Sequence, residues 1–405
     1  MSKRSSPPPP AAGATVSHLS AEEVQRLIDR AAHFNMLSLP ARSGNAAISA
    51  PGDRDRIIGF EIREALLQFG ILGQPPTARA PLTARNVVGE PAGTFSHRWL
   101  LMPPDFVAAP DREPPATPFD PKRSQRFVMM DSRCRLGSGK DGFRGFGTGQ
   151  TLPTTVGGRR RLLVTAIGTI LEGFGRLKGH EEGTYVYCGR LEPRRGFTGN
   201  VLLRVMDMQE TFRAETSLPP LAARRSAEPG ITYLLCRGQA VPGDPVTPRA
   251  GPDGRPLGLI VEQGLELLNL DFSAGSHGGL LSTARVGPPI GKITATITFD
   301  PTAPGGTLLD PIPFTTDDEF VFLDWTGQRI GSFTADSSEG RVFHTALAGQ
   351  PGIRFGGTGR VLSGAGPFAG IKGLMTDNSV VVFEPHVSAS VYVLRLEDPR
   401  GKFRA

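Results

Sequence analysis

The stretch GTILEGFGRLKG at residues 168–179 occurs a second time as GRVLSGAGPFAG at residues 359–370. The second copy starts 191 residues after the first (359 minus 168), and four glycines and one leucine coincide in register. Solenoid repeats have periods of about 20–50 residues, so this period is too long for a solenoid. It indicates that one whole domain and its linker have been copied.

The duplication extends to both sides of the glycine-rich stretch. Three further segments recur at offsets of 193, 192 and 191 residues: 127–131 with 320–324, 192–193 with 384–385, and 203–207 with 394–398. A drift of one or two residues is what hairpin loops of slightly different length produce. The repeat therefore predicts two domains of the same architecture, which suits a chain of 405 residues.

Composition favours many short strands and turns. The chain has 51 glycines and 37 prolines, and its net charge is +6. Arginines cluster at 159–161, 194–195 and 224–225. A nucleic-acid surface would need these clusters on one face with aromatic residues that stack on bases. We expect solvated loops instead and no nucleic-acid partner. No window of 18 apolar residues predicts a membrane span.

The cysteines and the N-terminus indicate a cytoplasmic protein without a metal site. Three scattered cysteines provide neither a disulfide framework nor the spacing of a zinc site. Residues 1–17 form a Pro- and Ala-rich arm without the apolar core of a secretory signal. We therefore expect a reducing compartment and no metal site.

The remaining sequence alternates like an all-β protein after one short helix. Ser20 and Glu23 have the spacing of a capping box, so a helix is predicted over 21–34 within the segment 18–50. Residues 57–72 fit a strand or a short helix. Strands are predicted at 162–171, 184–191, 200–206, 293–299, 352–362, 379–383 and 390–396.

These strands predict an all-β fold of two tandem eight-stranded antiparallel up-and-down β-barrels with a short N-terminal helix. Closing a sheet into a barrel removes the exposed strand edges. The first barrel is expected over 51–215 and the second over 259–405. Residues 216–258, rich in Pro, Gly and Arg, are the predicted linker, with room for one strand at 231–236.

The second glycine-rich copy, GGTGRVLSGAGPFAGIKG at 356–373, resembles the glycine hairpin of the allene oxide cyclase and dirigent protein superfamily. The first copy, GFGRLKG at 173–179, looks like the same element in a more divergent form. This resemblance implies an eight-stranded antiparallel barrel in each half. It also implies cofactor-independent cyclisation or coupling of an apolar small molecule inside a barrel. The N-terminal part of each half shows no family motif, so no family site residue is carried over.

The duplication helps to distinguish residues that maintain the fold from candidate catalytic residues. Polar positions present in both halves, such as Arg204 and Arg395, are expected to be structural, each paired with Asp207 or Asp398. Polar positions found in one half only are better candidates for a reaction. Asp131 and Asp324 occur in both halves, yet each follows an apolar run, and an acid at a barrel mouth could act as a general acid or base. The alternative is a turn-capping aspartate.

Two tyrosines are specific to the first half. Tyr185 and Tyr187 share one face of a predicted strand, and Cys188 lies on the other. If the tyrosines face inward, one hydroxyl could donate a hydrogen bond to a substrate oxygen. The alternative is that they cover the outside of the barrel where the halves meet. Cys188 is expected to be a small buried hydrophobe.

Two histidines and an acidic turn are specific to the second half. His344 and His386 could transfer protons near neutral pH, although a lone histidine is more often a surface or core residue. Asp377 and Asn378 are predicted to form a turn, and His277 lies in a glycine-rich loop.

The predicted catalytic residues are therefore Asp131, Asp324, Tyr185, Tyr187, His344 and His386. The predicted activity is a cofactor-independent cyclisation or isomerisation of an apolar, polyketide- or lipid-derived substrate. The alternative is a non-catalytic barrel that binds a hydrophobic molecule or a protein partner. Homo-oligomer formation stays open at this stage.

Overall fold

The computed structural model describes most of the chain from residue 55 to residue 397. The described residues are 55–68, 77–83, 91–136, 139–156, 158–192, 196–206, 231–239, 246–268, 280–281, 286–300, 303–323, 327–347, 350–382 and 387–397. The predicted arm, the helix at 21–34, Asp324, His386, His277, Asp207 and Asp398 lie outside these residues.

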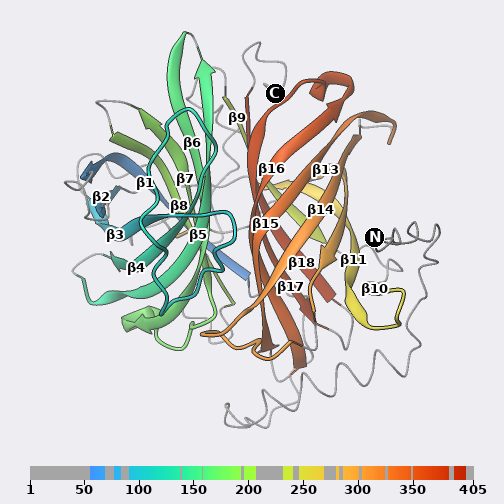
Figure 1. Ribbon diagram of the computed structural model, residues 1–405, viewed down its shortest axis with the longest axis horizontal. Coiled ribbons are helices and arrows are strands. Elements are labelled where there is room, and N and C mark those ends of the chain that lie inside the picture. Colours follow the sequence, from blue (N-terminus) through green and yellow to red (C-terminus); the bar gives the residue numbers. More distant parts are fainter. Residues whose placement is uncertain are drawn as a thin grey trace, which may run out of the picture.

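The described chain forms two nine-stranded antiparallel sheets (Figure 1). The first sheet contains β1 (Asp55–Gln68), β2 (Thr77–Thr83), β3 (Pro91–Met102), β4 (Arg126–Leu136), β5 (Asp141–Val156), β6 (Arg159–Phe174), β7 (Thr184–Glu192), β8 (Gly196–Met206) and β12 (Leu280–Leu281). The second contains β9 (Ile231–Gln239), β10 (Thr247–Ala250), β11 (Pro256–Leu268), β13 (Val286–Thr298), β14 (Ile312–Leu323), β15 (Arg329–Leu347), β16 (Gln350–Ala365), β17 (Gly373–Val382) and β18 (Val387–Glu397).

Each sheet returns to its own start. In the first sheet β1 pairs with both β2 and β8, so the strands β1 to β8 form a closed cycle of pairings, called here the first ring. In the second sheet β9 pairs with both β18 and β11, which closes a cycle of β9, β11 and β13 to β18, called here the second ring. The interior of each ring is its lumen. Figure 1 shows the two rings side by side, the first in blue to green and the second in yellow to red.

The all-β prediction is confirmed, and the predicted strands coincide with β6, β7, β8, β13, β16, β17 and β18. The prediction at 293–299 extends one residue past β13, and residue 383 of the prediction at 379–383 lies outside the described residues. The segment 57–72, left open between helix and strand, forms β1 over Asp55–Gln68. The assignment of 216–258 to a linker needs correction. Strands β9 and β10 from that segment belong to the second sheet, and β9 is the strand that closes the second ring.

The duplicated glycines have the same geometry in both halves. Gly175 and Gly366 have φ values of 62° and 64°, a left-handed conformation that favours glycine, and each begins a short 3-10 turn, η2 (Gly175–Leu177) or η3 (Gly366–Phe368). A Cβ atom on Gly173 would lie 1.9 Å from the Leu177 carbonyl oxygen, and one on Gly364 would lie 2.1 Å from that of Phe368. The chain can therefore fold back tightly after β6 and β16.

This tight return buries one apolar side chain at the end of each lumen. Leu177 is fully buried among the residues of the first core, and Phe368 is 3 % exposed among those of the second. The repeated hairpin therefore positions a hydrophobic plug at the same end of both rings.

The outer faces of the rings pack against each other. Ile167, Val186, Cys188 and Leu202 of the first ring form one buried apolar cluster with Val391 and Val393 of the second. Leu163 packs against Leu374 in the same way. Cys188 is a buried free thiol, as expected for a small hydrophobe, and it contributes to this contact between rings.

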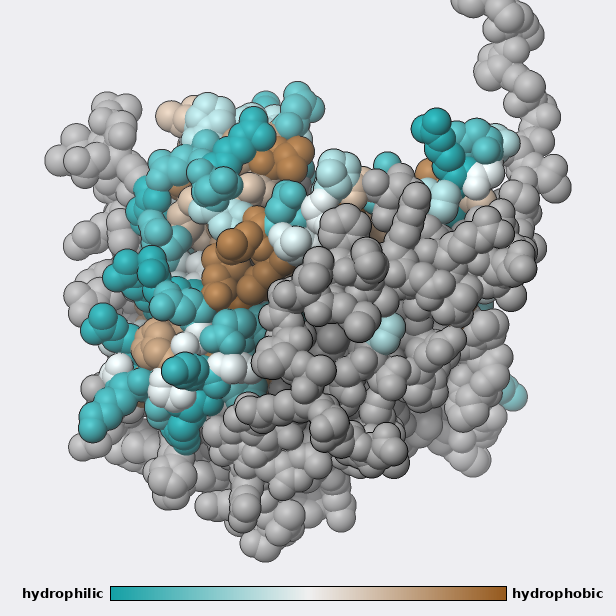
Figure 2. All heavy atoms as spheres, turned by 90° about the horizontal axis from the view of Figure 1, so that it is seen from below, coloured by the Kyte–Doolittle hydropathy of each residue, from teal (hydrophilic) through white to brown (hydrophobic). Residues whose placement is uncertain are grey.

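The exposed surface is mixed. Figure 2 shows a face on which the described residues are mostly hydrophilic, with one area where hydrophobic residues gather. Large apolar residues exposed in the described chain are Val107, Phe119, Leu257, Leu309, Ile330 and Leu362. None of the described helices is long and apolar enough to cross a membrane.

Candidate functional site

The first lumen is filled with aromatic side chains. Tyr185 and Tyr187 are both fully buried and pack with Phe95, Phe143 and Phe197. The Tyr187 and Phe197 rings stack at 4.3 Å. The two predicted tyrosines therefore face inward, and the alternative that they cover the contact between the halves is wrong.

Several polar atoms in this lumen have no hydrogen-bond partner. They are both ring nitrogens of His97, Nε1 of Trp99 and the hydroxyls of Tyr185 and Tyr187. Burial lowers the pKa of His97 to about 3, so its imidazole is neutral at physiological pH. Burial also raises the pKa of both tyrosines. These groups form a neutral aromatic core, since none of them is ionised near pH 7.

Asp131 lies on the outside of the first ring and not at a strand end. It is the extra residue of a bulge within β4, with a φ of 51°. Its side chain is 52 % exposed, and its Oδ2 accepts a hydrogen bond from Nε of Arg98 at 2.7 Å. This geometry explains the residue as an aspartate that stabilises a strained backbone position and an ion pair.

His344 is half-buried at the end of the second ring. Its backbone N–H donates to the Gly306 carbonyl oxygen at 2.8 Å, so the loop before β14 covers it. Its Nδ1 has no hydrogen-bond partner, and burial lowers its pKa. The structure thus places Tyr185 and Tyr187 in one ring and His344 in the other, and it does not bring them together.

A polar layer divides the second lumen between two apolar clusters. Strand β14 alternates strictly, and its inward residues run from Phe314 through Thr316 and Asp318 to Phe320. Phe314 belongs to one apolar cluster and Phe320 to the other. Thr316 and Asp318 therefore lie in the middle of the lumen, at a depth where β17 contributes Asp377 and Ser379.

The layer contains two buried carboxyl groups. Asp318 and Asp377 are 3 % and 1 % exposed. Burial, followed by the negative charge of Asp377, raises the pKa of Asp318 well above its ordinary value. Burial raises the pKa of Asp377 to about 6, against the lowering effects of the Ser379 hydroxyl and the Arg204 charge. Two buried carboxyls whose pKa values are both raised, in one apolar site, are typical of a site for acid and base chemistry.

Hydroxyl and amide groups surround the pair. Thr316 donates a hydrogen bond to Asp318 Oδ2 at 2.7 Å, and Asp318 Oδ1 has no partner. The Ser379 hydroxyl contacts both Asp377 Oδ1 and the Ser390 hydroxyl. The Tyr392 hydroxyl donates to Gln263 Oε1 at 3.0 Å. This set forms the acid layer of the second ring, named here for Asp318 and Asp377.

Strand register shows how the two lumens diverged. In the first ring Tyr187 pairs with Ala166, and in the second Asp377 pairs with Gly357, which lies 191 residues after Ala166 (357 minus 166). The same position of the ring therefore carries a tyrosine in one half and an acid in the other. This is the kind of one-sided polar difference that duplication predicts for a reaction site.

Sequence reasoning missed most of this layer. Asp377 and Asn378 were predicted to form a turn, but they lie within β17, because Ser379–Val382 continue the same strand on both neighbours. The alternation of Phe314, Thr316, Asp318 and Phe320 could have located Asp318. Gln263 and Tyr392 left no comparable signal, since they reach the layer only through ring closure.

A groove of about 440 Å³ opens outside the second lumen. The groove is lined by apolar residues of both rings and by two basic residues: Leu152, Val361, Leu362, Ile371, Arg360 and Lys372. Val361 and Ile371 also belong to the apolar cluster next to the acid layer. The groove is thus an exterior hollow at the lumen end that η3 closes, distinct from the acid layer.

The described residues contain no group of three or more side chains arranged to hold a metal ion. Comparison of the chain with family models, with curated proteins and with solved structures finds no match. The candidate site therefore depends on its own geometry.

Proposed function

We propose that the chain is a cofactor-independent isomerase or cyclase that acts on an apolar small molecule in the second lumen. The observation that carries this proposal is the acid layer, in which Asp318 and Asp377 are buried between two apolar clusters. Each ring would then be one up-and-down β-barrel of the allene oxide cyclase and dirigent type, copied in tandem. The glycine hairpins support that proposal by their closely similar geometry.

The two acids have complementary roles in the proposed reaction. Asp318, whose pKa burial raises well above its ordinary value, is placed to donate a hydrogen bond or a proton to a substrate oxygen when it carries its proton. Asp377 ionises above about pH 6 and can accept a proton from the substrate. A proton leaves the substrate at one carboxyl and enters at the other, so the product has the composition of the substrate.

The apolar clusters on the two sides of the acid layer would determine the conformation in which the substrate binds. Phe320 and Phe333 on one side and Phe314 and Phe355 on the other would hold a flexible apolar substrate in one conformation. Such positioning lowers the entropic cost of ring closure. The first ring, with its aromatic filling, would have a supporting role.

The proposal can be tested without knowing the substrate. Purified protein is incubated with a small-molecule extract of the producing cells, and the mixture is followed by liquid chromatography and mass spectrometry. The expected signature is a compound that disappears while a compound of equal mass appears at another retention time. Asp377→Asn should slow this conversion by about 100-fold or more, because one proton transfer loses its acceptor.

Tyr187→Phe is the matched control, since it changes the equivalent position of the other ring and should leave the rate unchanged. Equal conversion by wild type and Asp377→Asn would refute the acid layer as the reaction site. A compound that only binds, with no product of equal mass, would identify a non-catalytic binding protein instead.

A further inference from the structure

The first ring contacts the strands of the acid layer through polar groups buried at the junction of the rings. Arg204 on β8 is 3 % exposed. Its Nη1 donates hydrogen bonds to the backbone carbonyl oxygen of Asn378 and, at 3.3 Å, to Asn378 Oδ1. Its Nη2 donates to the Ala389 carbonyl oxygen at 3.3 Å. The guanidinium group of Arg204 therefore bridges β17 and β18 on the outer face of the second ring.

These contacts fall at the residues that alternate with the acid layer. Asn378 lies between Asp377 and Ser379, and Ala389 precedes Ser390, which pairs with Ser379. Because side chains alternate along a strand, a contact to the outer face at Asn378 determines where the inner side chains of its neighbours lie. The Asn378 amide also donates to Thr184 of the first ring, so its orientation is determined at both ends.

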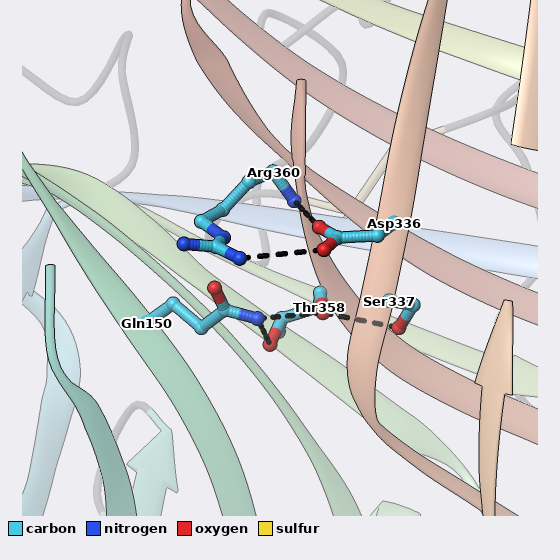
Figure 3. A network of polar contacts seen from close by, with 5 residues as sticks. All are labelled: Gln150, Asp336, Ser337, Thr358 and Arg360. Atoms are coloured by element: carbon cyan, nitrogen blue, oxygen red, sulfur yellow. Dashed lines mark hydrogen bonds and ion pairs between the residues drawn. The ribbon is translucent and has the colours of Figure 1, made fainter. Parts of the chain in front are cut away.

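A second polar contact reaches the adjacent strand. Figure 3 shows Gln150 of the first ring donating to the Thr358 carbonyl oxygen at 2.9 Å, the same oxygen that accepts a hydrogen bond from Ser337 at 3.0 Å. Thr358 follows Gly357, which is the residue opposite Asp377 in the β16–β17 ladder. The first ring thus contacts both strands that flank Asp377.

We infer that Arg204 is a positioning residue for Asp377, through which the first ring sets the geometry and charge of the acid layer in the second. The inference rests on the proposed function, which gives Asp377 its role. The contacts of Arg204 from which it is argued do not depend on any substrate. It gives the first ring a defined role despite its filled lumen. A buried cation near Asp377 also favours the ionised carboxylate, the form that accepts a proton.

The test is a titration of Asp377 followed by carbon-13 NMR of labelled aspartate in the full chain, with no ligand needed. Arg204→Met should raise the midpoint of Asp377 by about 1 pH unit or more, because the ionised form loses its opposite charge. Arg204→Lys keeps the charge but not the fork of donors. It should raise the midpoint by less and shift the backbone amide signals of Ser379 and Ser390.

Arg395→Met is the matched control, because Arg395 is the equally buried arginine at the duplicated position. It should leave the Asp377 midpoint unchanged. If Arg204→Met does not fold, Arg204→Lys decides the question. The inference is overturned if the folded Arg204 variants keep the wild-type midpoint and amide signals, or if Arg395→Met shifts Asp377 equally. Loss of the proposed activity would not alter this result, so the two failures are distinguishable.

Discussion

At the scale of single residues, the two lumens differ in how many of their buried polar groups have hydrogen-bond partners. Five polar atoms of the first lumen lie unpaired among aromatic rings: His97 Nδ1 and Nε2, Trp99 Nε1, and the Tyr185 and Tyr187 hydroxyls. In the second lumen most of the polar groups are paired: Ser379 with Asp377, Tyr392 with Gln263, and Thr316 with Asp318 Oδ2, while Asp318 Oδ1 has no partner. Hydrogen bonds orient the groups that they join, which a reaction site requires.

Asp318 should make the protein less stable at high pH. A carboxyl whose pKa is raised by folding stabilises the folded state fully below its unfolded pKa, near 3.8, and this contribution is lost as the pH rises through the folded pKa. Asp318→Asn removes that dependence. It should raise the free energy of unfolding by roughly 1–3 kcal/mol at pH 8 and by little at pH 4. Thermal unfolding at pH 4, 6 and 8 measures the difference.

Glu319→Gln serves as the control, because Glu319 is exposed on the outer face of β14 and is not among the groups that shift the pKa of Asp318. It should change stability by less than about 0.5 kcal/mol at every pH. A stability gain from Asp318→Asn that is the same at pH 4 and pH 8 would contradict the account.

The tyrosine hydroxyls of the two lumens should differ in energetic value. Tyr187→Phe removes a buried hydroxyl without a partner, so stability should stay the same or rise slightly. Tyr392→Phe removes the hydrogen bond to Gln263 and should cost about 1 kcal/mol. Urea unfolding of both variants gives the comparison. A larger loss from Tyr187→Phe would mean that its hydroxyl has a partner in solution.

At the scale of elements, the glycine hairpin was the part of the fold most readable from sequence. Its repetition predicted two equivalent domains, and the structure gives Gly175 and Gly366 nearly equal left-handed φ values. The strands followed from alternation. The role of 231–239 could not be predicted, because β9 closes the second ring by pairing with β18, far along the chain. Strand β10 pairs with β11, the next strand in the chain.

The hairpin glycines should differ in their tolerance of a side chain. Gly364→Ala places a Cβ atom 2.1 Å from a backbone oxygen that cannot move freely, so it should cost roughly 3 kcal/mol or more. Gly370 has open space and a φ of 72°, a conformation that asparagine tolerates. Gly370→Asn should therefore cost less than about 1 kcal/mol. Chemical denaturation measures the free energy of unfolding of both variants. Equal losses for Gly364→Ala and Gly370→Asn would contradict the explanation that Gly364 is required by its close approach to a backbone oxygen.

At the scale of the whole molecule, the contact between the rings could not be predicted from the sequence. Arg204 was expected to be structural and paired with an acid of its own half, yet its hydrogen bonds go to Asn378 and Ala389 of the other ring. Several outer residues of β7, β8 and β18 are apolar because they face another ring and not water: Val186, Cys188, Leu202, Val391 and Val393. Alternation alone cannot distinguish a strand buried on both faces by a second domain from one buried in a single core.

The rings should unfold together because of this contact. Val393 is fully buried in the cluster between them. Val393→Asp buries a charge there and should cost roughly 3 kcal/mol or more, or split the single calorimetric transition into two. Leu362→Asp is the control, since Leu362 is 54 % exposed and should change stability little. Two transitions in the wild-type protein would contradict a joint structure.

The most direct test of the account is the titration of the two buried carboxyls in the wild-type protein. Carbon-13 NMR of labelled aspartate, with signals assigned through Asp318→Asn and Asp377→Asn, reports each midpoint. We predict a midpoint of about 6 for Asp377 and, for Asp318, a midpoint raised well above the ordinary value of an aspartate. If both aspartates titrate with a midpoint of about 4, the ordinary value of a solvated aspartate, no acid layer exists in the second lumen.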